Sequence, residues 1–164
     1  MPPPFAPLAS SFDLCLHHRP TVSVLSVTAP IPTVEAINAF LAAEFPGTGN
    51  ECVEIGPRHA LARRVSDPAT LRPGGFVSGP TQFGLADAAL WYALFGAVGL
   101  EPMAMTSELS IRFLRPAAGD VLHARADVHQ VGRRNVVGSV TMWMDERVDK
   151  PVSVAQGTYT RPAT

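Results

Sequence analysis

The residue of this chain that could most readily do chemistry is Asp87. No lysine or arginine occurs between Arg72 and Arg112, and Asp87 lies in the middle of that stretch among the mostly apolar residues from Phe83 to Phe95. A carboxylate in such surroundings is costly unless it is hydrogen-bonded, protonated or used for function. Asp87 is therefore the first candidate for a functional residue.

The alternative is that Asp87 has only a structural role. Aspartate does cap helices, but it does so at the first position of the helix. The start signal in this region is Ser78-Gly79-Pro80, because proline suits the first turn. Asp87 lies about two turns further along the predicted helix. That is too deep for a cap, which favours a functional role.

Hydrophobic periodicity predicts the elements that surround this central helix. An earlier helix is predicted from Thr33 to Glu44 and ends at Pro46-Gly47. Residues 52–65 predict one or two short strands with a turn at Gly56-Pro57. The apolar residues of the earlier helix have helical spacing: Val34, Ile37, Phe40 and Leu41.

After the central helix the hydrophobic period changes to two. Residues 105–113 alternate as in a half-buried strand, with Leu109 and Ile111 on one face and Thr106 on the other. Consecutive strands joined by short turns are antiparallel. We therefore predict an α+β fold in which a curved antiparallel sheet wraps around one long helix. The further strands are predicted over residues 122–128, 136–144 and 152–159.

Composition limits the classes of protein that fit. The 164 residues are 46% hydrophobic and 16% charged, which is enough for one domain with a substantial core. The formal net charge of −1 gives no electrostatic reason to expect nucleic acid or an anionic membrane as partner. Cys15 and Cys52 have no metal or redox spacing, which favours a reduced cytoplasmic protein. Residues 1–30 are rich in proline and aperiodic, so they predict an extension outside a domain formed by residues 31–164.

Several familiar sites are missing from the sequence. It contains no Walker loop, no dinucleotide fingerprint, no Gly-x-Ser-x-Gly elbow and no His-Glu-x-x-His motif. We therefore expect no metal and no cofactor. The histidines have no metal-site spacing: His17, His18, His59, His123 and His129.

The order of motifs resembles a known family. It is similar to the hotdog-fold acyl-CoA thioesterases of the phenylacetate-pathway (PaaI) type, and the resemblance covers residues 31–162. The pairing of Leu-Ala-Asp-Ala with a later Phe-Leu-Arg-Pro-Ala is specific, whereas either motif alone is weak. The segments that carry the resemblance are Gly75–Pro80, Leu85–Ala89, Met105–Ala117 and Gly119-Asp120.

The resemblance implies roles for individual residues. In that family a His-Gly-Gly turn opens the central helix, and an acidic residue lies nine positions after the histidine. Here Ser78-Gly79-Pro80 stands at the turn and Asp87 at the acid position. The implied roles are an oxyanion-binding N–H on Gly79 and a base or nucleophile in Asp87, with Ser78, Pro80 and Gln82 expected to face the substrate. This chain departs from the family in having serine for histidine and proline, which has no N–H, for the second glycine.

The spacing of the two implied catalytic groups predicts an oligomer. Gly79 and Asp87 are eight residues apart, or about 12 Å along a helix axis. They cannot both touch one carbonyl group from the same chain. Two copies in antiparallel contact could bring Gly79 of one against Asp87 of the other. The resemblance likewise implies a homodimer with shared sites, and a homotetramer built as a dimer of dimers.

Hydrolysis of an acyl-CoA thioester is the leading functional hypothesis, with CoA entering only as part of the substrate. Arg115, Arg133 and Arg134 are the candidates for phosphate contact, because arginine suits phosphate geometry. They lie in the two turns that flank the strand beginning at Val121. The alternative hypothesis is that these arginines are merely solvated.

Two other functions stay open at this point. A non-catalytic acyl-CoA-binding hotdog protein fits the loss of the histidine and of the second glycine. An enoyl-CoA hydratase of the same fold fits less well. It would need a histidine near the start of the central helix, and no histidine lies between His59 and His123.

Overall fold

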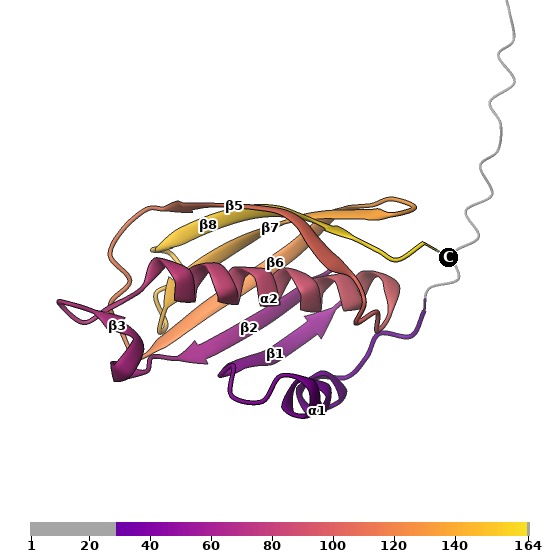
Figure 1. Ribbon diagram of the computed structural model, residues 1–164. Coiled ribbons are helices and arrows are strands. Elements are labelled where there is room, and N and C mark those ends of the chain that lie inside the picture. Colours follow the sequence, from indigo (N-terminus) through magenta and orange to yellow (C-terminus); the bar gives the residue numbers. More distant parts are fainter. Residues whose placement is uncertain (1–28, 164) are drawn as a thin grey trace, which may run out of the picture.

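The computed structural model describes residues 29–163, so the predicted extension lies outside the described residues apart from its last two positions. One six-stranded antiparallel sheet dominates the molecule, with strand order β1-β2-β6-β7-β8-β5. A small hairpin of β3 and β4 lies apart from it (Figure 1). The elements are α1 Val34–Glu44, β1 Asn50–Gly56, β2 His59–Val65, a 3₁₀ turn Pro68–Thr70, β3 Leu71–Arg72, β4 Phe76–Val77, α2 Gly79–Val98, β5 Met105–Phe113, β6 Val121–Val131, β7 Asn135–Met144 and β8 Ser153–Thr160.

Helix α2 runs along the concave face of the curved sheet, as Figure 1 shows. Ten of its twenty residues are buried, and they pack on the inward side chains of β6 and β7. This confirms the predicted α+β architecture and both predicted helices. No helix within residues 29–163 has the length and apolar character needed to cross a membrane. The largest fully buried side chains include Tyr92, Phe95, Leu85, Leu90, Leu94, Leu122, Met142 and Met144.

One edge of the sheet is covered by α1, and within residues 29–163 the other edge is open. At one edge the side chain of Asn38 on α1 bonds both backbone groups of Cys52 on β1, each at 2.9 Å. Among the described residues nothing pairs with the outer side of β5 at the other edge. Met105 and Phe113, at the two ends of β5, are 70% and 53% exposed. An open strand edge with exposed apolar side chains is a common site of pairing with another chain.

Strand β5 departs from the predicted half-buried strand in two respects. Only Leu109 and Ile111 are partly buried, because β5 lies at the edge of the sheet. In addition, the register with β8 shifts between Thr106 and Glu108, so that Ser107 is an extra residue in the pairing. Such a β-bulge reverses the alternation of side chains across it. Thr106 therefore faces α2 together with Leu109 and Ile111, contrary to the strict alternation expected from the sequence.

Candidate active site

The Asp87 carboxylate is half-buried on α2 and is held by two hydroxyl groups. Thr106 Oγ1 donates to Asp87 Oδ1 at 2.7 Å, and the Tyr159 hydroxyl donates to the same oxygen at 2.8 Å. The other carboxylate oxygen, Oδ2, makes no hydrogen bond with any described residue. One oxygen is thus anchored, and the other is available to a water molecule or a substrate.

Sequence reasoning missed both hydroxyl donors. Thr106 on β5 and Tyr159 on β8 are direct cross-strand partners, so their hydroxyl groups converge on one point of α2. The bulge at Ser107 turns Thr106 toward the helix, and no local pattern in the sequence predicts that bulge. Tyr159 lies 72 residues from Asp87, so its hydroxyl could have been recognised only as a buried donor in need of a partner.

Tyr159 is suited to be a permanent donor. Its side chain is only 4% exposed. Burial, and secondly the negative charge of Asp87, raise the pKa of Tyr159 far above its usual range. The phenol therefore stays protonated at neutral pH. It also donates to the backbone carbonyl oxygen of Asp87 at 3.0 Å, which ties the side chain of Asp87 to its own helix turn.

Replacing Tyr159 with phenylalanine is expected to lower kcat about tenfold, because one charge-assisted hydrogen bond that orients Asp87 is lost. The free energy of unfolding should fall by only about 1–2 kcal/mol. Steady-state kinetics and thermal denaturation measure the two effects. Tyr92→Phe is the control, since Tyr92 is also a buried tyrosine but lies on α2 itself and does not hydrogen-bond to Asp87. Equal losses of kcat in the two variants would contradict a positioning role for Tyr159.

The start of α2 leaves one backbone donor without a partner among the described residues. Ser78 is the N-cap, and its side chain accepts from the N–H of Thr81 at 3.3 Å. The N–H of Gln82 donates to the Ser78 carbonyl oxygen at 3.0 Å. Pro80 has no N–H. The N–H of Gly79 therefore remains available, at the positive end of the helix dipole.

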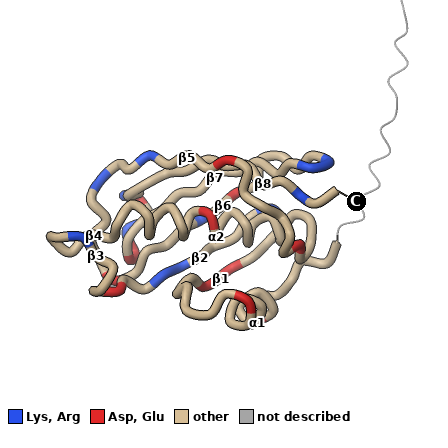
Figure 2. The backbone as a smooth tube through the Cα atoms, viewed as in Figure 1, with Lys and Arg blue, Asp and Glu red and all other residues tan. Residues whose placement is uncertain are grey.

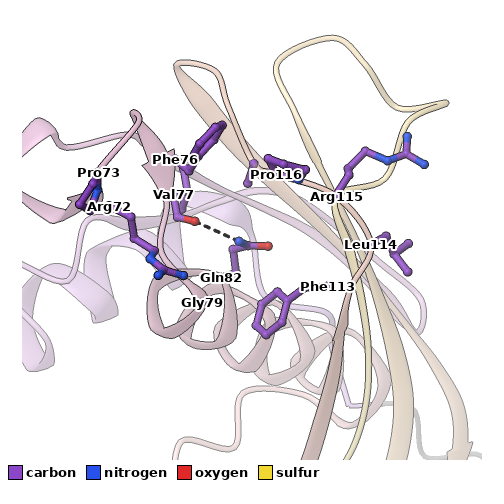
Figure 3. Close-up of a pocket in the computed structure, with 11 residues that line it drawn as sticks. Arg72, Pro73, Phe76, Val77, Gly79, Gln82, Phe113, Leu114, Arg115 and Pro116 are labelled. Atoms are coloured by element: carbon purple, nitrogen blue, oxygen red, sulfur yellow. Dashed lines mark hydrogen bonds between the residues drawn. The ribbon is translucent and has the colours of Figure 1, made fainter.

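Gly79 opens onto a cavity of about 600 Å³ at this end of the molecule. Phe113 closes one side of it, since a methyl group on Gly79 would lie 3.2 Å from Phe113 Cζ. Ser78 and Pro80 are not among the lining residues. Figure 3 shows the lining side chains. They are Arg72, Pro73, Phe76, Val77, Gly79, Gln82, Phe113, Leu114, Arg115, Pro116 and Ala117.

Gln82 lines the cavity, but both ends of its amide are already engaged. Its Nε2 donates to the Val77 carbonyl oxygen at 3.1 Å, and its Oε1 accepts from the Ser153 hydroxyl at 2.9 Å. The side chain is 4% exposed. These bonds tie α2 to β4 and β8, so Gln82 forms part of the wall of the cavity and holds the helix start in place.

The three arginines predicted to contact phosphate lie at opposite ends of one chain. Arg115 follows β5, whereas Arg133 and Arg134 form the hairpin between β6 and β7. The eleven residues of β6 separate these two turns by about 36 Å. Figure 2 shows basic segments at both ends of the sheet. Within one chain these arginines cannot contact the same phosphate group.

The Gly79 and Asp87 groups are also separate within one chain, as their spacing predicts. Asp87 does not line the cavity at Gly79. It lies near the opposite end of β5, beside Thr106. Apart from Asp87, helix α2 carries no charged residue (Figure 2). The described chain therefore holds two half-sites, a donor with a cavity at one end of β5 and a positioned carboxylate at the other.

Comparisons with known proteins show what this arrangement is similar to. Residues 74–150, which include α2 and the half-sites on β5, match the Thioesterase superfamily. No curated protein sequence matches the chain significantly.

Solved structures extend the similarity to most of the chain. A candidate thioesterase from Silicibacter sp. TM1040 is 27% identical with a TM-score of 0.74, and the match covers 83% of this chain and 96% of that one. The PaaI protein of the E. coli phenylacetic acid degradation operon is 26% identical with a TM-score of 0.62, covering 76% and 85%. Zebrafish thioesterase superfamily member 2, at 16% identity, shares the fold with a TM-score of 0.70, covering 80% and 99%. Over residues 74–150 the chain is thus similar to the Thioesterase superfamily, and its fold is similar to that of the PaaI-like hotdog proteins.

Proposed function

We propose that the protein hydrolyses an acyl-CoA thioester to the free acid and CoA, with Asp87 as base or nucleophile and the Gly79 N–H as oxyanion donor. One observation carries this proposal. Asp87 has one oxygen fixed by two hydroxyl groups and the other oxygen unbonded to any described residue, in a helix that is otherwise uncharged. A positioned carboxylate of this kind suits proton abstraction or nucleophilic attack.

The chemistry needs few groups. As a base, Asp87 takes a proton from water, and the resulting hydroxide adds to the thioester carbonyl carbon. The carbonyl oxygen then becomes an oxyanion that accepts a hydrogen bond from the Gly79 N–H. The C–S bond breaks, the electron pair leaves on sulfur, and the thiolate takes up a proton. As a nucleophile, Asp87 itself adds to the carbonyl carbon, and water cleaves the resulting anhydride.

A homodimer paired through β5 would complete two such sites. Thr106 at one end of β5 contacts Asp87, and Phe113 at the other end lies against Gly79. Antiparallel pairing of β5 with a second copy around a two-fold axis places the Thr106 end of each copy opposite the Phe113 end of the other. Asp87 of one copy then approaches Gly79 of the other. A tetramer built from two such dimers stays a prediction.

The same dimer would gather the predicted phosphate contacts. Asn135, which follows the Arg133-Arg134 hairpin, pairs with Thr160, and Thr160 pairs with Met105. The hairpin therefore lies at the Asp87 end of its own chain. Two-fold pairing brings it toward the Arg115 end of the other copy. CoA phosphates bound between Arg115 of one copy and the hairpin of the other fit this arrangement.

The outward face of α2 offers a test of the dimer. Gly79, Phe83 and Asp87 lie on one face because they are four residues apart, and Phe83 is 40% exposed. Phe83→Glu should weaken dimerisation about a hundredfold, because an unpaired carboxylate buried in the interface costs at least about 3 kcal/mol. Sedimentation analysis and activity at a fixed concentration measure the effect.

Val53→Glu is the matched control for this variant. Val53 is similarly exposed, at 38%, but lies on β1 at the other edge of the sheet. We expect it to remain dimeric and active. A dimeric Phe83→Glu protein with normal activity would show that this face of α2 is not in the interface.

Release of free thiol from a panel of acyl-CoA esters is the direct test of the proposed function. Chain length, branching and aromatic character should be varied, because the cavity has aromatic and proline walls. We expect turnover that depends on the acyl group. Tight binding of acyl-CoA without thiol release would overturn the proposal and favour a protein that only binds acyl-CoA.

A further inference from the structure

Arg72 lines the same cavity as Gly79, the proposed oxyanion donor, although nothing in its sequence context singled it out. It is in β3, directly opposite Phe76 of β4. Figure 3 shows the Arg72 side chain directed toward the start of α2, where Gly79 lies. The side chain of Arg115, the other arginine that lines this cavity, points away from Gly79 in the same view.

The hairpin that carries Arg72 is fixed at its base. Leu71 packs against the hydrophobic core, and Val77, its cross-strand partner, is buried. The N–H of Val77 donates to the Ala117 carbonyl oxygen at 2.8 Å. At the tip, the N–H of Gly75 donates to the Arg72 carbonyl oxygen at 3.0 Å, and Gly75 has a φ of +77° that favours glycine. These contacts fix the backbone of Arg72 at the wall of the cavity.

Arg72 has no competing partner in the part of the chain that the structure describes. It takes part in none of the ion pairs or side-chain hydrogen bonds found over residues 29–163. Among the residues that the structure describes, no carboxylate lines the cavity. A guanidinium group in this setting favours a negative charge near Gly79, and its several N–H donors are free to meet that charge.

The proposed chemistry calls for a second hydrogen-bond donor at the start of α2. An oxyanion carries a full negative charge, whereas the first turn offers a single uncommitted N–H among the described residues, that of Gly79. Pro80 contributes none. We propose that the Arg72 guanidinium is a catalytic residue that donates a second hydrogen bond to the thioester carbonyl oxygen as it becomes an oxyanion. The guanidinium keeps its proton throughout, and the inference rests on the proposed thioester hydrolysis.

The test compares two thioesters of the same acyl group, one of CoA and one of N-acetylcysteamine, which has no phosphate. Arg72→Gln should lower kcat about a hundredfold for both substrates, as loss of one oxyanion donor does, with little change in KM. The kcat of Arg72→Lys should lie between that of Arg72→Gln and that of the unmodified protein, because lysine keeps the charge but not the planar donors. Guanidinium ion added to Arg72→Gly should restore part of the lost activity. Arg125→Gln, which removes the same charge from β6, should behave like the unmodified protein.

Three results would overturn the assignment. A loss confined to KM of the CoA substrate would mean that Arg72 binds phosphate. An equal loss of kcat in Arg72→Gln and Arg125→Gln would mean a general effect of charge. A kcat within about twofold of the unmodified protein would mean that Arg72 does not touch the reacting oxygen.

A binding measurement separates this inference from the proposed function. If the unmodified protein hydrolyses no thioester, the proposed function fails. Titration calorimetry with the free carboxylic acids that correspond to the acyl panel then tests Arg72, because a carboxylate oxygen is a stable mimic of the oxyanion. At least tenfold weaker binding to Arg72→Gln than to the unmodified protein would support the contact. Equal binding would overturn it.

Discussion

Asp87→Asn is expected to lower thioester hydrolysis about a thousandfold or more while leaving the protein folded. Asparagine keeps the side-chain oxygen that accepts from Thr106 and Tyr159. The oxygen that the amide NH2 replaces makes no hydrogen bond with any described residue, so both hydroxyl donors keep their acceptor. What is lost is the negative charge that takes a proton from water or attacks the carbonyl carbon. Initial rates and thermal denaturation measure the two effects.

Asp87→Ala provides the contrasting variant. Alanine removes the acceptor of both hydroxyl groups, and the buried hydroxyl of Tyr159 loses its side-chain partner. We expect a loss of about 1–3 kcal/mol in the free energy of unfolding together with the loss of activity. If Asp87→Asn instead lowers the melting temperature and keeps full activity per folded molecule, Asp87 is a structural residue.

Two inactive variants are expected to restore activity when they are mixed. Gly79→Pro removes the proposed oxyanion N–H, and Asp87→Ala removes the carboxylate. If each site combines Gly79 of one copy with Asp87 of the other, a mixed dimer has one site with both lesions and one with none. Random pairing makes half of the dimers mixed, so activity should reach about a quarter of that of the unmodified protein. Co-refolding followed by a thiol-release assay measures it.

Gly79→Ala is the control for the proline variant. Both substitutions place a Cβ atom against Phe113, but only proline removes the N–H. The extended backbone of Ser78, with ψ of 156°, suits a residue that precedes proline, so Gly79→Pro should fold. Gly79→Ala should retain most of its activity. If mixed dimers form and no activity returns, the site lies within one chain or Gly79 is not the donor.

Local patterns were sufficient to predict both helices and the strands of the main sheet, but not the β3–β4 hairpin. The helical spacing around Ile37, the start signal at Ser78 and the period of two after Pro102 each report how a short segment buries its apolar side chains. The structure confirms these elements. The candidate roles of Asp87 and Gly79 came from the sequence as well, because a single carboxylate in an apolar helix and the residue after an N-cap are local features. Those roles remain predictions that the variants above test.

The rest of the candidate site depends on contacts between distant segments. The Thr106 hydroxyl reaches Asp87 because of a bulge at Ser107, and a bulge is an irregularity in strand pairing that no residue in the segment specifies. For the same reason the opposite positions of Arg115 and the Arg133-Arg134 hairpin follow from the length of β6 and not from their shared type.

The sequence by itself therefore singled out Asp87 and Gly79 as candidates and predicted the helices and main-sheet strands around them, because burial of apolar side chains imposes a period that can be read locally. Only the tertiary structure decided how those residues are supported. Tyr159 comes to Asp87 across 72 residues of chain, and the β3–β4 hairpin directs Arg72 toward Gly79. The Tyr159–Asp87 contact depends on how the six-stranded sheet curves around α2, and the direction of Arg72 depends on a separate hairpin that packs at the start of the helix.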